Sequence, residues 1–121
     1  MLFRSVFEER ARRDQARREL DAAGLHLLAR AEKIVRAESL GWWQTRSKEI
    51  HHFGIDLDRY VAAIAAVDPK TPNRACYWTI YKAAVPTVIG RNTREIPAII
   101  DELRDLRPDL EGEITGAGEQ A

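Results

Sequence analysis

The stretch LFRSVFEERARRDQARRELDAAGLHLLARAEKIVRAESL, residues 2–40, decides the fold class of this 121-residue chain. It contains no proline and one glycine, and it is rich in arginine, alanine, glutamate and leucine, which are strong helix formers. From Leu20 to Val35 its apolar residues recur at three- and four-residue steps, as on one face of an amphipathic helix. We therefore expect a long Arg-rich N-terminal helix, in which Gly24 can introduce a kink or a break.

The early part of this helix has little to bury. Five of the nine residues in the segment 10–18 are arginine, and the segment contains no large apolar side chain. A helix of this kind packs poorly against a core, so we expect it to project or to pair with a partner. Phe3 and Phe7 lie just before it and are predicted interface residues.

Glycine and proline divide the rest of the chain into shorter predicted helices. Gly54 is expected to end a helix over 42–53, and Asp56 to cap the next one, which stops at Asp68-Pro69. Proline cannot donate a backbone hydrogen bond, so Pro86 is expected to confine 86–89 to a single turn.

Two more segments complete the predicted bundle. Residues 74–85 are almost all apolar, which places them at the centre of the bundle. Residues 92–95, Asn-Thr-Arg-Glu, are typical of a capping box and predict the start of a last helix. Its apolar stripe runs from Ile96 to Leu106, and Arg107-Pro108 is expected to end it.

These segments predict one all-α domain over residues 1–110, a compact bundle of five to six helices. Residues 1–40 would form a long helical arm and residues 41–110 the compact part. Residues 111–121 are small and polar, so we expect a flexible tail. No run shows the alternation of a β-strand.

The formal net charge of zero conceals an asymmetry along the chain. Residues 1–40 carry a net charge of +2, residues 41–94 of +4, and residues 95–121 of −6. The basic middle suits a nucleic-acid partner. The acidic end can cancel that effect if Asp101, Glu102, Asp105 and Asp109 fold onto the arginines.

Two windows partly match a helix-turn-helix, with glycine at the turn and apolar residues about six and ten positions later. One window is centred on Gly54 and the other on Gly90. The second is favoured, because arginine and asparagine can read base edges and a threonine near a helix start can hold phosphate. The candidate nucleic-acid-binding residues are Arg91, Asn92, Thr93 and Arg94, together with Arg46 and Lys48.

Trp42 and Trp43 are adjacent, and neighbours on a helix point about 100° apart, so both cannot face inward. An exposed tryptophan here would serve as a stacking platform for single-stranded nucleic acid or as a protein-binding hot spot. The alternative is that both bridge the first helices to the rest of the bundle. Both are candidate interface residues.

Arg46 and His51 are separated by four residues, and Phe53-Gly-Ile-Asp56 follows them. This pattern resembles the HEPN superfamily of all-α ribonucleases. The resemblance implies that Arg46 and His51 are catalytic, in a site made by a dimer, with arginine holding phosphate and histidine transferring protons. It covers about eleven residues.

Other classes of site and location find less support. The chain has too few spaced cysteine and histidine residues for a metal site, and we expect no metal and no cofactor. The longest stretches without a charged residue are eight residues, so no membrane span is expected, and the charged N-terminus indicates no secretory signal and a cytoplasmic protein. Cys76 is expected to be buried, and His26 partly so.

Two functions are open at this point. The favoured hypothesis is a small bacterial or phage-type regulatory protein that is not an enzyme and contacts nucleic acid through the basic helix-turn-helix-like region. The alternative is a helical protein–protein interaction module, such as an antiactivator, an inhibitor or a virion component, that oligomerises or docks through Phe3, Phe7, Trp42 and Trp43. A HEPN-like ribonuclease is a minor third hypothesis.

Overall fold

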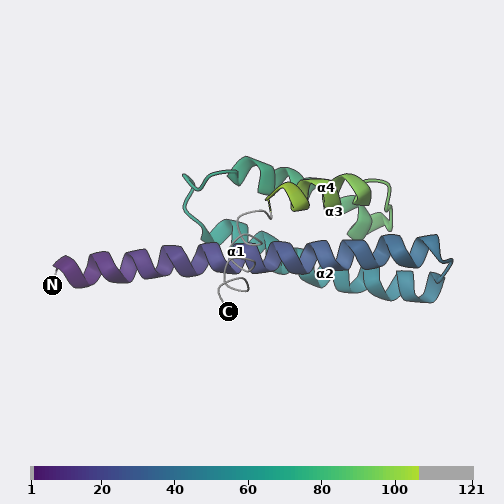
Figure 1. Ribbon diagram of the computed structural model, residues 1–121, viewed down its shortest axis with the longest axis horizontal. Helices are drawn as coiled ribbons and strands as arrows, with labels where there is room; N and C mark the ends of the chain where they lie inside the picture. The colour runs from purple at the N-terminus through teal and green to yellow at the C-terminus, as the bar shows by residue number, and fades with distance from the viewer. Residues whose placement is uncertain (1, 107–121) are drawn as a thin grey trace, which may run out of the picture.

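Four helices make up residues 2–106, the part of the chain that the structure describes, with side chains described from Ser5 onward. In this computed structural model they are α1 (Leu2–Ser39), α2 (Trp43–Ala66), α3 (Arg74–Gly90) and α4 (Ile96–Leu106). α1 and α2 form a long antiparallel hairpin, and α3 and α4 lie together along one side of it (Figure 1). The all-α prediction is confirmed for these residues. The predicted tail, 111–121, lies outside them.

The prediction of a kink or break at Gly24 is wrong, because α1 continues through it as one straight helix (Figure 1). Leu20 on one side of the glycine and Leu27 and Leu28 on the other are almost completely buried. Glycine costs a helix about 1 kcal/mol relative to alanine, whereas each buried leucine contributes about 1.5–3 kcal/mol. The helix ends instead at Ser39, and Gly41 in the turn that follows adopts a positive φ of 70°.

The expected break at Gly54 is also absent, which lowers the number of helices. α2 continues through Gly54, which does not take the left-handed conformation of a helix end. Phe53, Leu57 and Tyr60 keep one buried stripe continuous across it. Asp56 is therefore not an N-cap but a buried residue in the middle of a helix. The predicted five to six helices become four in the described range.

Pro86 lies inside α3 and does not end it, contrary to the prediction. The proline sits in the last turns of the helix, where the carbonyl oxygen of Pro86 accepts the backbone N–H groups of Arg91 and Asn92. Arg91 adopts the left-handed conformation, with φ 54°, that closes many helix ends. One lost backbone hydrogen bond is thus tolerated near a well-closed C-terminus.

α3 is a peripheral helix and not the predicted centre of the bundle. It packs against α2 and α4, and α1 and α2 pack together most extensively. Tyr77, Ile80 and Ala84 face the core, but Cys76 is exposed, so its predicted burial is wrong. Apolar composition alone does not distinguish a central helix from a peripheral one with exposed apolar residues.

The core lies between the hairpin and the α3–α4 pair. It is one continuous cluster, to which every helix contributes large buried side chains. The largest of those that are fully buried are Leu20, Leu27, Leu28, Ile34, Phe53, Tyr60, Ile64, Ile80, Ile96 and Ile99.

A charged cluster joins α1 to α2 beside this core. The guanidinium of Arg30 donates from Nε to Asp56 Oδ2 at 3.1 Å and from Nη1 to Glu49 Oε2. Both carboxylates are nearly buried, and these hydrogen bonds and ion pairs raise the pKa of Arg30 further despite the opposing effect of burial. Because a buried carboxylate without a partner is costly, this cluster fixes the register of the two helices.

The two helical glycines allow a matched stability test. A Cβ at Gly24 would meet only Tyr60 Cε2 at 3.8 Å, an ordinary contact, so Gly24→Ala is expected to raise the free energy of unfolding by about 0.5–1 kcal/mol. A Cβ at Gly54 would lie 3.3 Å from Val88 Cγ1, which is a tight contact. Gly54→Ala should therefore raise the free energy of unfolding less than Gly24→Ala does, or lower it. Denaturant titration of both variants measures the difference. A loss of stability in Gly24→Ala would contradict this account of α1.

Candidate functional site

One end of the molecule carries most of the residues predicted to bind nucleic acid. The α1–α2 turn and the α3–α4 turn lie at this end, opposite the N-terminus (Figure 1). Arg91 Nη1 donates to Ser47 Oγ at 2.9 Å, which ties the two turns together. We call residues 40–48 and 88–94 the end surface. The fold thus joins two basic segments that are far apart in the sequence.

Arg46 and Thr93 belong to a hydrogen-bonded network inside the end surface. Arg46 donates from Nε to Glu38 Oε1 at 2.7 Å and from Nη2 to the carbonyl oxygen of Arg91 at 3.1 Å. The Thr93 hydroxyl donates to the same Glu38 oxygen. Two of the predicted nucleic-acid ligands therefore already have partners within the chain.

Glu38 is the centre of this network, and the sequence analysis did not identify it. Partial burial alone would raise the pKa of its carboxyl group. The hydrogen bonds from Thr93 and Arg46 and the charge of Arg46 outweigh that effect and hold the pKa below its usual value of 4.5. The carboxylate therefore neutralises Arg46 and links α1 to both turns.

Asn92, Arg94 and Lys48 have exposed side chains on the end surface. The predicted capping box is wrong in position, because α4 begins at Ile96, beyond residues 92–95. Asn92 Oδ1 instead accepts the backbone N–H of Arg94 at 3.0 Å, which stabilises the turn. The predicted basic residues therefore lie in the turn between α3 and α4 and not in the first turn of a helix.

Trp42 and Trp43 are both exposed, with 52% and 65% of their surface accessible. Neither is buried in the contact between the first helices and the rest of the bundle, so that alternative is wrong. The guanidinium of Arg46 lies 5.8 Å from the centre of the Trp43 ring, a cation–π distance. α2 begins beside them without a side-chain cap.

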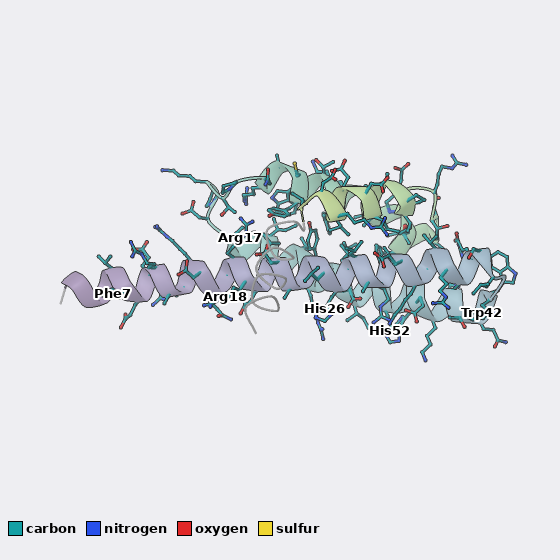
Figure 2. All side chains as sticks on the ribbon, viewed as in Figure 1. Phe7, Arg17, Arg18, His26, Trp42 and His52 are labelled. Carbon is teal, nitrogen blue, oxygen red and sulfur yellow. The ribbon has the colours of Figure 1, made fainter. Side chains whose placement is uncertain are left out.

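The other predicted interface residue whose side chain is described, Phe7, lies at the opposite end of the molecule from Trp42 (Figure 2). All but the first few residues of α1 separate them, about 50 Å at 1.5 Å per residue. The side chain of Phe3 lies outside the described part. The predicted interface residues therefore do not form one patch on a single chain.

We call residues 2–15 the N-terminal arm: its beginning extends beyond the rest of the bundle (Figure 1), and Arg12 and Arg13 near its end line a hollow with the turn that follows α2. Every side chain from Ser5 to Gln15 is exposed, and Phe7 is 67% accessible. Ion pairs one helical turn apart, such as Arg13 with Glu9 at 2.8 Å, support the helix without a core. The segment that was expected to project or to pair with a partner, 10–18, is exposed as far as Gln15, whereas Ala16 packs against the core and Arg17 is half-buried.

A groove that the sequence analysis missed opens between α1 and α2 next to the end surface. It has a volume of about 230 Å³ and is lined by Lys33, Arg36, Ala37, Trp42, Thr45 and Glu49. The antiparallel hairpin brings the basic residues of α1 beside the start of α2. The signal that could have indicated it is a basic pair one helical turn apart, Lys33 and Arg36, nine and six residues before Trp42.

Two larger surface hollows, of about 320 and 410 Å³, lie between α1 and the C-terminal part of α2, and neither is lined by a tryptophan. A hollow between α1, α2, α3 and α4, lined by Gly24, Tyr60, Tyr77 and others, measures about 20 Å³, which is room for one water molecule. No cluster of three or more potential metal ligands occurs among the described residues. No described helix is both long enough and apolar enough to cross a lipid bilayer.

Arg46 and His51 do not come together within one chain. They are five positions apart on α2, so their side chains leave the helix about 140° apart. Arg46 is held by Glu38, whereas His51 is exposed and its ring packs edge-on against His52. His26 is exposed rather than partly buried. Ribonuclease activity stays a prediction that depends on a second chain.

No protein family model, no curated protein and no solved structure matches this chain.

The Glu38 network predicts a pH-dependent contribution to stability. A carboxyl group whose pKa is lowered on folding stabilises the protein above its unfolded value of about 4.5, and the contribution is lost as the pH falls through the folded pKa. Glu38→Gln should therefore lower the melting temperature at pH 7, and the difference from the wild type should shrink below about pH 4. Glu95→Gln, on the exposed turn, is the matched control. A difference that does not shrink at all as the pH is lowered from 4.5 until the protein unfolds would show that the charge of Glu38 is not responsible.

Proposed function

We propose that this protein is a helical interaction module that self-associates through the N-terminal arm. The observation that carries the proposal is that every side chain of the arm from Ser5 to Gln15 is exposed. A helical segment without a buried face gains little stability from packing, and most helices in proteins depend on such packing. A second helix laid against the arm would supply it.

The apolar residues of the arm support this use. Val6 and Phe7 are 57% and 67% exposed. Burying Val6 and Phe7 in a partner would contribute about 1.5–3 kcal/mol for each side chain. The tip of α1 is therefore the apolar part of a surface that is otherwise charged.

The charges of the arm favour a second copy of this chain as the partner. Acidic residues Glu8, Glu9 and Asp14 alternate with arginines along the same exposed segment. A helix with both signs can pair with itself through opposite charges, whereas an arm with only arginines would repel its copy.

Replacing the apolar tip should separate the copies. Val6→Glu/Phe7→Glu is expected to weaken self-association about 100-fold or more, because two apolar side chains are lost from the contact and carboxylates are buried in their place. Sedimentation velocity over a range of concentrations measures this. The wild type should sediment as a dimer or larger species, and the variant at the monomer mass of 13.8 kDa.

Leu40→Glu/Ile89→Glu is the matched control, because it replaces two exposed apolar residues at the opposite end. It should leave the oligomeric state unchanged. A monomeric wild type at high concentration would refute the proposal. Equal effects of the two double variants would refute the assignment to the arm.

Nucleic-acid contact is the second candidate function, in the manner of a small bacterial or phage-type regulator. The observation that favours it is that the end surface carries exposed Lys48, Arg91 and Arg94 as well as exposed Trp42 and Trp43, on two turns that the hydrogen bond from Arg91 to Ser47 ties together. Exposed cations bind phosphate, and exposed aromatic rings stack with bases. Asp101, Glu102 and Asp105 are exposed on α4, which makes α4 a poor helix for the major groove of a duplex.

Salt dependence tests this second candidate. Binding of an oligonucleotide should weaken steeply between 50 and 200 mM salt through counterion release. Lys48→Glu/Arg94→Glu should lower the affinity further, while Lys70→Glu/Lys82→Glu, which changes the net charge equally at other exposed sites, should have less effect. Fluorescence anisotropy measures both. No binding at 50 mM salt would exclude this function.

A further inference from the structure

The groove between α1 and α2 combines a flat aromatic ring with two cations. Lys33 and Arg36 come from one face of α1, and Trp42 lies at the turn that leads into α2. All three side chains are exposed, and Trp42 keeps 52% of its surface accessible. Thr45 on α2 adds a hydroxyl group to the opposite wall.

The acidic residues near this groove are paired elsewhere. Glu49 lines the groove, but its carboxylate accepts from Arg30. Glu32 lies one turn before Arg36, and its carboxylate pairs with Arg104 of α4 at 3.4 Å. Lys33 and Arg36 are themselves one turn apart and repel each other. The groove therefore carries a local positive charge that an anion would relieve.

Trp42 is better placed than Trp43 to receive a planar ligand. The Trp43 ring already has the Arg46 guanidinium 5.8 Å from its centre. Trp42 lines the groove itself, so a ring stacked on its indole would lie next to both cations. Base stacking on an aromatic side chain is worth about 1–3 kcal/mol for each base.

From this arrangement we infer that the groove binds single-stranded nucleic acid, with one base stacked on Trp42 and the adjoining backbone phosphates on Lys33 and Arg36. In a duplex the faces of the bases are covered by their neighbours, so an aromatic platform favours a single strand. The inference rests on the second candidate function, nucleic-acid contact, and names its ligand and its site. It does not depend on self-association of the arm.

The test uses the full chain and a fluorescently labelled oligothymidylate of about twelve nucleotides, within the range that single-strand binding sites cover. Lys33→Glu/Arg36→Glu is expected to weaken binding at least about tenfold at 50 mM salt. Lys70→Glu/Lys82→Glu makes the same change in net charge away from the groove and should weaken binding no more than about threefold. Melting temperatures check that all variants fold.

The aromatic contribution is tested separately. Trp42→Ala should weaken binding about 5- to 100-fold, which corresponds to the loss of one stacked base. Trp43→Ala is the matched control and should have a smaller effect. Quenching of tryptophan fluorescence on binding should also be reduced more in Trp42→Ala than in Trp43→Ala.

The possible failures are distinct. No binding of the strand at 50 mM salt removes both the second candidate function and this site. In another outcome, Lys48→Glu/Arg94→Glu weakens binding, but Lys33→Glu/Arg36→Glu has no more effect than its control, Lys70→Glu/Lys82→Glu. That outcome supports nucleic-acid binding by the end surface and overturns the groove as its site. Tighter binding to a duplex of the same sequence, or equal binding of free thymidine monophosphate, overturns the assignment to a single strand.

Discussion

The packing of α1 on α2 is the interaction on which the rest of the structure depends. The leucine and isoleucine stripe of α1 meets the stripe of α2 from Ile50 to Ile64, and Arg30 sets their register by holding Glu49 and Asp56. α3 and α4 then close over one side of this hairpin (Figure 1). The difference in length between the two helices, 38 against 24 residues, creates the arm. The first residues of α1 extend beyond the end of α2, whereas Arg12 and Arg13 already line a hollow with Ala66 and the turn that follows α2.

The same hairpin determines where the charges lie. By turning at Gly41 it sets Lys33 and Arg36 beside Trp42, and it brings Glu38 within reach of Arg46 and Thr93. Among the described residues, positive charges are therefore balanced locally, by single acidic partners such as Glu38 for Arg46. Some arginines are neutralised inside the chain, and other cations remain exposed near the Trp-Trp turn. Asp109 lies outside the described residues.

Much of the fold could be predicted from local patterns, and the errors share one cause. The long first helix, the turn after Ala66 and the stripe from Ile96 follow from composition and periodicity. Gly24, Gly54 and Pro86 were each assigned a break that does not occur. The local cost of one glycine or of a proline near a helix end is smaller than the gain from an uninterrupted buried stripe. The separation of Phe7 from Trp42 could not be predicted either, because it depends on the continuity of α1.

The sequence by itself determined that the chain is helical, that its first helix carries a segment with nothing to bury, and that one of two adjacent tryptophans must be exposed. These follow from helix propensity and from the 3.6-residue repeat, which are local properties. Only the tertiary structure decided which charges are paired and which are free. Arg46 is neutralised because Glu38, eight residues away and on another helix, lies 2.7 Å from it. Lys33 and Arg36 leave the groove positively charged because the nearby carboxylates of Glu49 and Glu32 pair with Arg30 and Arg104 instead. These contacts exist only after the helices have packed.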